Sequence, residues 1–107
     1  MTHRVIFYCP DYGKIKLFIT VGMDDDKQPS ELFITADQSG STLDGFCDAW
    51  SIAMSLCLQH GVKLKTLADK FEFTEFSPGG ITDNERIPMA KSIPDYVVRW
   101  MAMEFNK

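Results

Sequence analysis

The sequence has no Cys-x-x-Cys pair and no long apolar run. Its three cysteines, Cys9, Cys47 and Cys57, are odd in number, so they cannot form a complete disulfide framework, and their spacing fits no zinc site. No apolar stretch is long enough for a signal peptide or a membrane span. We therefore expect a cytoplasmic protein that does not bind a membrane and holds no structural metal.

Basic residues are also few, with 11 Lys and Arg against 15 Asp and Glu and a net charge of −4. A protein that binds nucleic acid needs a basic face to neutralise phosphates, so this balance argues against a nucleic-acid partner. The acidic run 24–26 lacks the alternate-position ligand spacing of a calcium loop, and we interpret it as a solvated turn. The composition is otherwise that of a globular protein, and residues 1–107 are predicted to form a single domain.

Three stretches near the start have the pattern of β-strands. Residues 4–9 form a short apolar run that ends in a turn cluster, which predicts a strand at an edge of the sheet. Residues 15–21 and 31–36 alternate apolar residues of one face with residues of the other. A short polar connection joins these two stretches, and because parallel pairing would need a longer crossover, they are predicted to form an antiparallel hairpin.

A helix is predicted over residues 42–60, and it carries no charged residue between Ala49 and His60. Apolar residues spaced three and four apart form its main predicted core stripe: Leu43, Phe46, Cys47, Trp50, Met54, Cys57 and Leu58. Ile52 and Leu56 form a second, smaller strip around the side. A chain of this size rarely has enough mass to bury a helix on all sides. Either this helix is the spine of the core, or one side of it meets another chain.

The second half is predicted to hold two further helices separated by a loop. The first covers residues 63–72, with Leu64, Leu67, Ala68 and Phe71 facing inward. Residues 73–88 are predicted to form a long loop, and loops of this length more often have a function or contact a partner than serve only as connections. Phe73 and Phe76 are expected to anchor this loop to the core, and Phe76 is also a candidate interface residue.

The last predicted helix covers residues 92–105. Ser92 would cap it, Pro94 fits the first turn because no N–H is needed there, and Asp95 would reach back to the helix start. The expected fold is therefore α+β, with an antiparallel sheet of two or three strands and three helices packed on one face.

Few residues suggest a ligand site, and none specifies a reaction. Ser39, Gly40, Ser41 and Thr42 stand at a helix start, where backbone N–H groups favour an anion, although the same residues also serve to cap the helix. Arg86 and Lys91 could meet a phosphate or an acidic partner. The two histidines, His3 and His60, have no metal-ligand spacing, and no Ser-His-Asp or Cys-His arrangement is supported. No catalytic residue is therefore assigned.

Three segments, taken in order, resemble one family. They are GKIKLFITVG (13–22), ELFITADQSGSTLDGFCDAWSIAMSLCLQHGV (31–62) and KFEFTEFSPGGITDNERIPMAKSIPDYVVRWM (70–101). Together they resemble the TSCPD domain, which is found at the C-terminal end of adenosylcobalamin-dependent (class II) ribonucleotide reductases and in free-standing small proteins. The resemblance covers residues 13–105, which is nearly the whole sequence.

The sequence departs from the motif that names this family, Thr-Ser-Cys-Pro-Asp, which here reads Lys91-Ser92-Ile93-Pro94-Asp95. Because Ile93 replaces the cysteine, a thiol or metal role does not carry over to this position, and the remaining residues favour helix capping. The resemblance implies that the reductase's catalytic cysteines and cobalamin site would lie in a large upstream region that this sequence does not contain. We therefore expect no cofactor and no reductase activity by this chain alone.

We consider two main hypotheses, the first from the resemblance and the second from the residues at the predicted helix start. In the first, the chain is a non-catalytic accessory module that binds a ribonucleotide reductase in trans, or forms a homo-oligomer through Ile52, Leu56 and Phe76. In the second, it captures a nucleotide or a related phosphate at residues 39–42, as a homo-oligomer. A third hypothesis is that the chain is an enzyme whose active site is not recognised from the sequence. A reductase gene beside this one, or a viral source, would favour the first hypothesis.

Overall fold

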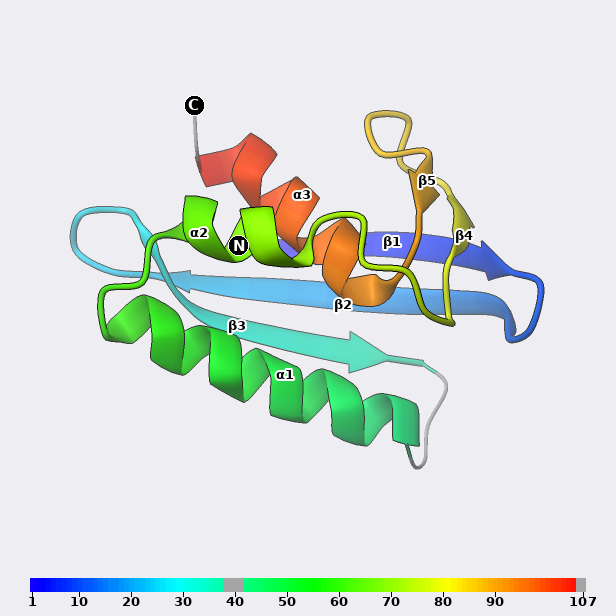
Figure 1. Cartoon of the computed structure of the whole chain (residues 1–107), viewed down its shortest axis with the longest axis horizontal. Coiled ribbons are helices and arrows are strands. Elements are labelled where there is room, and N and C mark those ends of the chain that lie inside the picture. Colours follow the sequence, from blue (N-terminus) through cyan, green and yellow to red (C-terminus); the bar gives the residue numbers. More distant parts are fainter. Residues whose placement is uncertain (38–41, 106–107) are drawn as a thin grey trace.

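The computed structural model describes residues 1–37 and 42–105, which form an α+β fold (Figure 1). Five strands make one antiparallel sheet in the order β3-β2-β1-β4-β5. The strands and helices follow the chain as β1 (Thr2–Cys9), β2 (Gly13–Met23), β3 (Pro29–Ala36), α1 (Thr42–Gln59), α2 (Leu64–Phe71), β4 (Gly80–Thr82), β5 (Met89–Ala90) and α3 (Ile93–Phe105). None of the helices in these described ranges is long and apolar enough to cross a membrane.

The predicted hairpin of β2 and β3 is confirmed, with Ile19 opposite Ile34. Alternate residues of both strands are buried, whereas Phe18 and Phe33 on the other face are exposed. This alternation places the apolar core on one face of the sheet, because successive strand residues point to opposite sides. The opposite face carries exposed aromatic side chains.

The sheet is wider than predicted because of β4, which lies in the stretch 73–88 expected to be a loop, and β5, which directly follows that stretch. These strands have only three and two residues, too few to show an alternating pattern in the sequence. Their position depends on pairing with β1, where Tyr8 stands opposite Ile81. Gly80 has a φ of 152°, and a Cβ there would collide with the carbonyl oxygen of Tyr8, so this close approach requires glycine.

The prediction that the first strand lies at an edge is therefore wrong. β1 pairs with β2 on one side and with β4 on the other, so it is the central strand. Its partner β4 follows about seventy residues later in the chain, and local sequence carries no signal for a contact between such distant segments.

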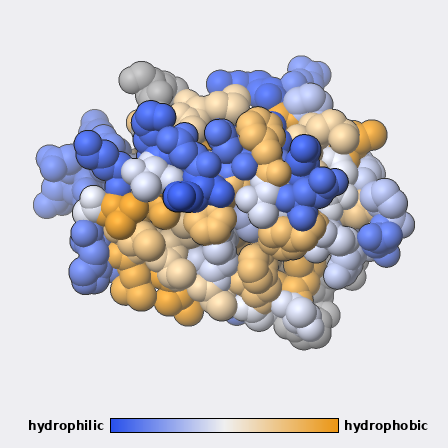
Figure 2. Space-filling view, viewed as in Figure 1, coloured by the Kyte–Doolittle hydropathy of each residue, from blue (hydrophilic) through white to orange (hydrophobic). Residues whose placement is uncertain are grey.

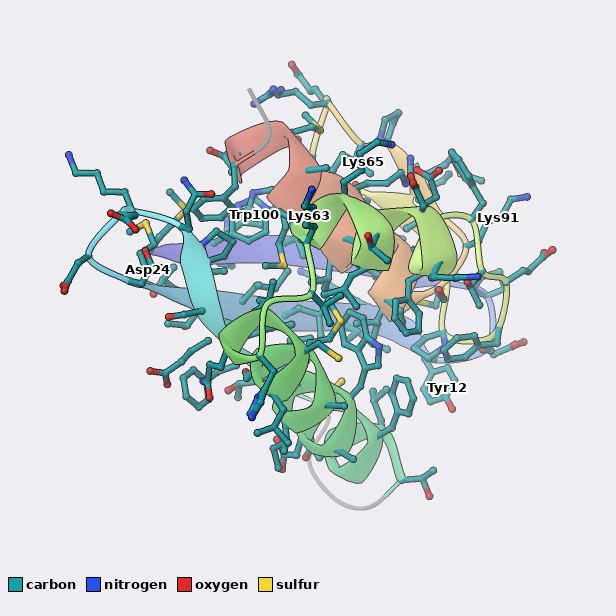
Figure 3. All side chains as sticks on the ribbon, turned by 60° about the vertical axis from the view of Figure 1, so that its left-hand side comes forward. Tyr12, Asp24, Lys63, Lys65, Lys91 and Trp100 are labelled. Carbon is teal, nitrogen blue, oxygen red and sulfur yellow. The ribbon has the colours of Figure 1, made fainter. Side chains whose placement is uncertain are left out.

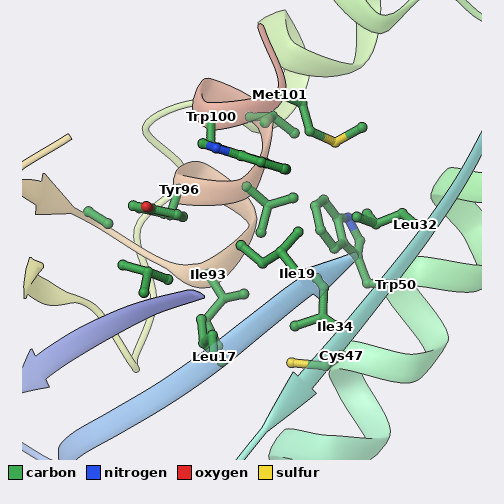
Figure 4. Packing of buried hydrophobic residues seen from close by; sticks show 14 of the residues in the cluster. Leu17, Ile19, Leu32, Ile34, Cys47, Trp50, Ile93, Tyr96, Trp100 and Met101 are labelled. Carbon is green, nitrogen blue, oxygen red and sulfur yellow. The ribbon is translucent and has the colours of Figure 1, made fainter. Parts of the chain in front are cut away.

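The centre of the core is α3 rather than α1. Ile93, Tyr96, Val97 and Met101 of α3 are completely or almost completely buried. In Figure 4, Ile93, Tyr96 and Met101 of α3 belong to the same cluster as Leu17 and Ile19 of β2. In α1, by contrast, the buried side chains are Cys47, Trp50, Ser51 and Met54, while Phe46 is exposed and Leu43, Cys57 and Leu58 are half-buried. Only one stripe of α1 reaches the core, because this helix packs along β3, an edge strand.

Gly61 ends α1. Gly61 has a φ of 90°, the left-handed conformation that glycine adopts without strain. The N–H of Val62 donates to the carbonyl of Cys57, and the N–H of Gly61 donates to that of Leu58. These two bonds form a Schellman motif, which satisfies the last carbonyls of the helix and turns the chain toward α2.

Candidate functional site

A groove of about 470 Å³ runs between α1 and the outer edge of β3. We call it the α1–β3 groove, and its lining residues come from these two elements alone: Glu31, Leu32, Phe33, Ile34, Thr35, Asp48, Ser51, Ile52, Ser55, Leu56 and Gln59. In the space-filling view, hydrophobic side chains gather over the part of the surface formed by α1 (Figure 2). A concave, mainly apolar surface of this size is a candidate binding site.

Polar side chains of α1 hold the helix against the open edge of β3. The N–H of Leu32 donates to Oγ of Ser55 at 2.9 Å, and Nε2 of Gln59 donates to the carbonyl of Ser30 at 3.0 Å. The Ser55 hydroxyl lies 2.9 Å from the carbonyl of Ser51 in its own helix. An edge strand normally exposes unpaired backbone groups to other chains. Here α1 satisfies part of that edge, so it occupies the place of a further strand.

The walls of the groove expose large apolar side chains. Ile52 is 61% exposed and Leu56 is 51% exposed on α1, and Phe33 is 56% exposed on β3. α1 has no charged residue between Ala49 and its last residue, Gln59, so nothing on this part of the helix keeps the apolar strip solvated. Contiguous exposed apolar surface of this kind is typical of interaction sites.

The charges at the groove are of one sign. Glu31 and Asp48 are both exposed, and neither forms an ion pair within the described residues. No Lys or Arg is among the described residues that line the groove. Ser51 also borders it, and its side chain is 3% exposed, with a hydroxyl that finds no hydrogen-bond partner in the described part of the chain. The groove thus combines apolar walls with an acidic rim.

The predicted interface residues fall into two places. Ile52 and Leu56 lie together in the α1–β3 groove. Phe76 lies elsewhere, packed edge-on against Phe46 with ring centroids 5.6 Å apart. The expectation that Phe73 and Phe76 anchor their segment to the core is wrong, because both are exposed, and Phe73 instead packs under the guanidinium of Arg99. Sequence reasoning missed Phe33, although an apolar residue on the outer face of a strand next to the apolar helix was a usable signal.

The predicted ligand residues do not share one cavity. Ser39, Gly40 and Ser41 lie outside the described residues. Thr42 borders a small apolar pocket of about 190 Å³ whose lining includes Tyr12, Phe46, Phe76 and Ile93.

Lys91 borders a different hollow, together with Asp11 and Glu75. Tyr12 and Lys91 lie at one end of the molecule and Asp24 of the acidic run at the other (Figure 3). Asp24 accepts the N–H groups of Asp26 and Gln28, so this run is a closed turn. Nη1 of Arg86 lies 4.0 Å from Oε1 of Glu104, near the end of α3.

The Ser92-Pro94-Asp95 residues join α3 to the segment that follows α2. Oγ of Ser92 accepts the N–H of Asp95 at 3.1 Å, which is the geometry of a helix N-cap, and donates to the carbonyl of Thr74 at 2.6 Å. The buried Asp95 carboxylate reaches back past the cap to the N–H of Lys91 at 2.8 Å and to the N–H of Phe73 at 2.6 Å. Nε of Arg99 donates to the same carboxylate at 2.9 Å.

A second polar cluster joins the first strand to α3, and sequence reasoning missed it. Nε2 of His3 lies 2.7 Å from the Tyr96 hydroxyl, and Nδ2 of Asn84 donates to that hydroxyl at 2.9 Å. The His3 ring also stacks on Trp100. Burial lowers the pKa of His3, with Glu104 opposing the effect, and burial raises the pKa of Tyr96 to about 12.

The titratable groups do not suggest catalysis or metal binding. Burial raises the pKa of the Cys47 thiol to about 11 and also raises that of Cys9, so both thiols are protonated and poor nucleophiles at neutral pH. The described residues contain no group of three or more His, Cys, Asp or Glu side chains that could hold a metal ion.

Comparison with known proteins gives one consistent result. The TSCPD domain family matches residues 2–105. A vitamin B12-dependent ribonucleotide reductase of Rhodopirellula baltica is 41% identical over 88 residues, which is 82% of this chain and 8% of that protein. Reductases with the same name from Streptantibioticus cattleyicolor and Streptomyces coelicolor are each 42% identical over 93 residues, which is 87% of this chain and 16% and 10% of those proteins. No solved structure matches the chain significantly.

Proposed function

Because this chain belongs to the TSCPD domain family, we propose that it is a non-catalytic binding module of deoxyribonucleotide synthesis. It docks on the catalytic part of a vitamin B12-dependent ribonucleotide reductase in the cytoplasm. The chain spans between 8% and 16% of the length of the three relatives described above. A module that acts like the matching region of these proteins needs a face that contacts the rest of the reductase.

The observation that carries this proposal is the exposed apolar α1–β3 groove. Its three most exposed apolar side chains are more than half accessible, and a sheet face with exposed aromatic residues adjoins it. A domain that worked alone would gain nothing from leaving this surface uncovered. The protonated thiols of Cys9 and Cys47 and the absence of a metal-binding cluster in the described ranges support binding over catalysis.

The test uses a reductase whose own matching region is removed. The Rhodopirellula baltica reductase would be prepared without the region that matches this chain, and the chain would be added in trans. We expect saturable binding by isothermal titration calorimetry and a change in reductase activity on addition. The intact reductase is the control, because its own domain occupies the contact surface. The same experiment would be repeated with the reductase encoded in the genome that encodes this chain. Absence of binding to both truncated reductases would refute the proposal.

Nucleotide or phosphate binding at the start of α1 remains a second candidate. One observation favours it: Thr42 at the first position of α1 borders an apolar pocket with three aromatic side chains, Tyr12, Phe46 and Phe76. Aromatic rings stack on bases, and a helix start favours phosphate. A nucleotide panel should then raise the melting temperature, and Thr42→Glu should abolish the rise by repelling phosphate. A panel that leaves the melting temperature of the original chain unchanged would exclude this function.

A further inference from the structure

We propose that the α1–β3 groove is the docking site for one amphipathic helix of the partner, with an apolar stripe flanked by Lys or Arg. The inference rests on the proposed function and states which surface makes the contact and what chemistry the partner presents. It follows from three properties of the groove, namely its blocked strand edge, its apolar walls and its acidic rim.

α1 lies along the edge of β3 and bonds part of it, which disfavours an added strand as the guest. A peptide strand would need the outward backbone groups of β3. The N–H of Leu32 and the carbonyl of Ser30 already bond to Ser55 and Gln59 of α1. The guest must therefore bind through side chains, as a helix in a groove does. The groove follows α1 from Asp48 to Gln59, a span of about 17 Å, which is enough for about three turns of a second helix.

The apolar walls match the stripe of such a helix. Ile52 and Leu56 stand one turn apart on α1, and Phe33 faces them from β3. Apolar side chains spaced three and four apart on the guest would fit between these walls.

The acidic rim sets the charge of the guest and argues against a second copy of this chain. Glu31 stands near the Gln59 end of the groove, since it follows Ser30, and Asp48 stands about two helical turns from Ser55 toward the start of α1. Neither carboxylate has an ion-pair partner in the described ranges. A guest with Lys or Arg beside its apolar stripe would pair with both. A two-fold dimer through this groove would instead bring four carboxylates together, in a chain whose net charge is already −4.

The test measures binding of two helical peptides by fluorescence anisotropy. Both carry leucines at positions i, i+3, i+4 and i+7, and one has lysines and the other glutamates beside this stripe. We expect the lysine peptide to bind at least about tenfold more tightly than the glutamate peptide. Equal binding of the two peptides, or no binding of either, would overturn the inference.

Three variants of this chain locate the contact. Leu56→Lys and Asp48→Lys should each weaken binding of the lysine peptide at least about fivefold, the first by removing an apolar wall and the second by reversing a rim charge. Glu85→Lys changes the net charge as Asp48→Lys does. It lies between β4 and β5, at the opposite edge of the sheet, and should leave binding unchanged. If Glu85→Lys weakens binding as much as Asp48→Lys, net charge rather than the groove is responsible and the inference is wrong.

The same variants separate this inference from the proposed function. If the original chain binds the reductase and Leu56→Lys binds it equally well, the proposed function stands and the groove is not the contact. If the lysine peptide binds through the groove but no reductase does, the chemistry of the groove stands and the proposed function fails. A two-chain mass in sedimentation that returns to one chain in Leu56→Lys would show that a second copy fills the groove, which overturns the inference.

Discussion

Replacing Asp95 by alanine should be among the most destabilising single changes in this chain. Its side chain is completely buried and accepts hydrogen bonds from the N–H of Phe73, the N–H of Lys91 and two nitrogens of Arg99. The alanine variant leaves two backbone donors without an acceptor and a guanidinium without its counter-charge. All three losses fall at the junction between α3 and the segment after α2.

The size of the effect follows from these partners. Removing one member of a buried ion pair costs about 3–5 kcal/mol, and a buried donor without a partner about 1–3 kcal/mol. The Arg99 side chain is 24% exposed, so water recovers part of the loss, and the sum belongs at the low end. We expect a loss of about 3–4 kcal/mol in the free energy of unfolding. For a domain of this size that corresponds to a fall of about 12–16 °C in melting temperature.

The assay is urea denaturation followed by tryptophan fluorescence, with a matched exposed pair as the control. Lys65 and Asp69 form an ion pair with the same four-residue spacing at 3.2 Å, but their side chains are 76% and 58% exposed. Asp69→Ala should therefore cost less than about 0.5 kcal/mol. Asp95→Asn keeps the shape of the side chain but removes its charge. Comparing it with Asp95→Ala separates the effect of lost charge and hydrogen bonds from the effect of lost side-chain volume. An Asp95→Ala loss below about 1 kcal/mol, or an Asp95→Asn variant as stable as the original chain, would refute this reasoning.

Three further predictions follow from single contacts. Burial lowers the pKa of His3 below its ordinary value of 6.5. As the pH falls, the His3 side chain is therefore protonated more readily in the unfolded chain than in the folded one, and the stability of the fold should decrease below about pH 6.5. The urea midpoint should fall less between pH 8 and pH 5 in His3→Gln than in the original chain. Identical pH profiles of the two proteins would contradict this. Ser55→Ala removes the acceptor of the Leu32 N–H and should cost about 1–2 kcal/mol in urea denaturation, and a cost within error of zero would mean that water replaces the hydroxyl. Cys57 is half-buried, whereas Cys47 is buried with a thiol pKa of about 11, so a thiol reagent should modify Cys57 first. Mass spectrometry of partially modified protein identifies the labelled cysteine, and labelling of Cys47 before Cys57 would contradict this prediction.

Elements with a strong local pattern could be predicted from the sequence. The alternation in β2 and β3 and the three- and four-residue spacing in the helices reflect which side of each element is buried. β4 and β5 could not be predicted, because three and two residues carry no period. The contact between His3 and Tyr96 joins residues 93 positions apart. Nothing in the local sequence of either residue indicates the other.

The candidate site was predicted in part, for a related physical reason. The apolar strip of Ile52 and Leu56 was visible because a helix exposes its faces at a fixed period. Phe33 completes the groove only because β3 is an edge strand that α1 packs against, and that arrangement is a property of the whole sheet. The apolar content of α1 indicated a spine helix, yet α3 is the more deeply buried. Composition reports how apolar a helix is, whereas its place in the fold decides how much of it is covered.

The two groups of residues that matter most lie at opposite edges of the sheet, and this separates stability from binding. Ser92 and Asp95 fasten α3 beside β5, at the end of the strand order opposite β3. Ile93 stands where the family motif has cysteine, and none of the hydrogen bonds at this junction uses its side chain. The junction therefore needs no thiol. Because the α1–β3 groove shares no residue with it, substitutions of exposed groove residues should change binding while the unfolding free energy stays constant, and Asp95 variants should do the reverse.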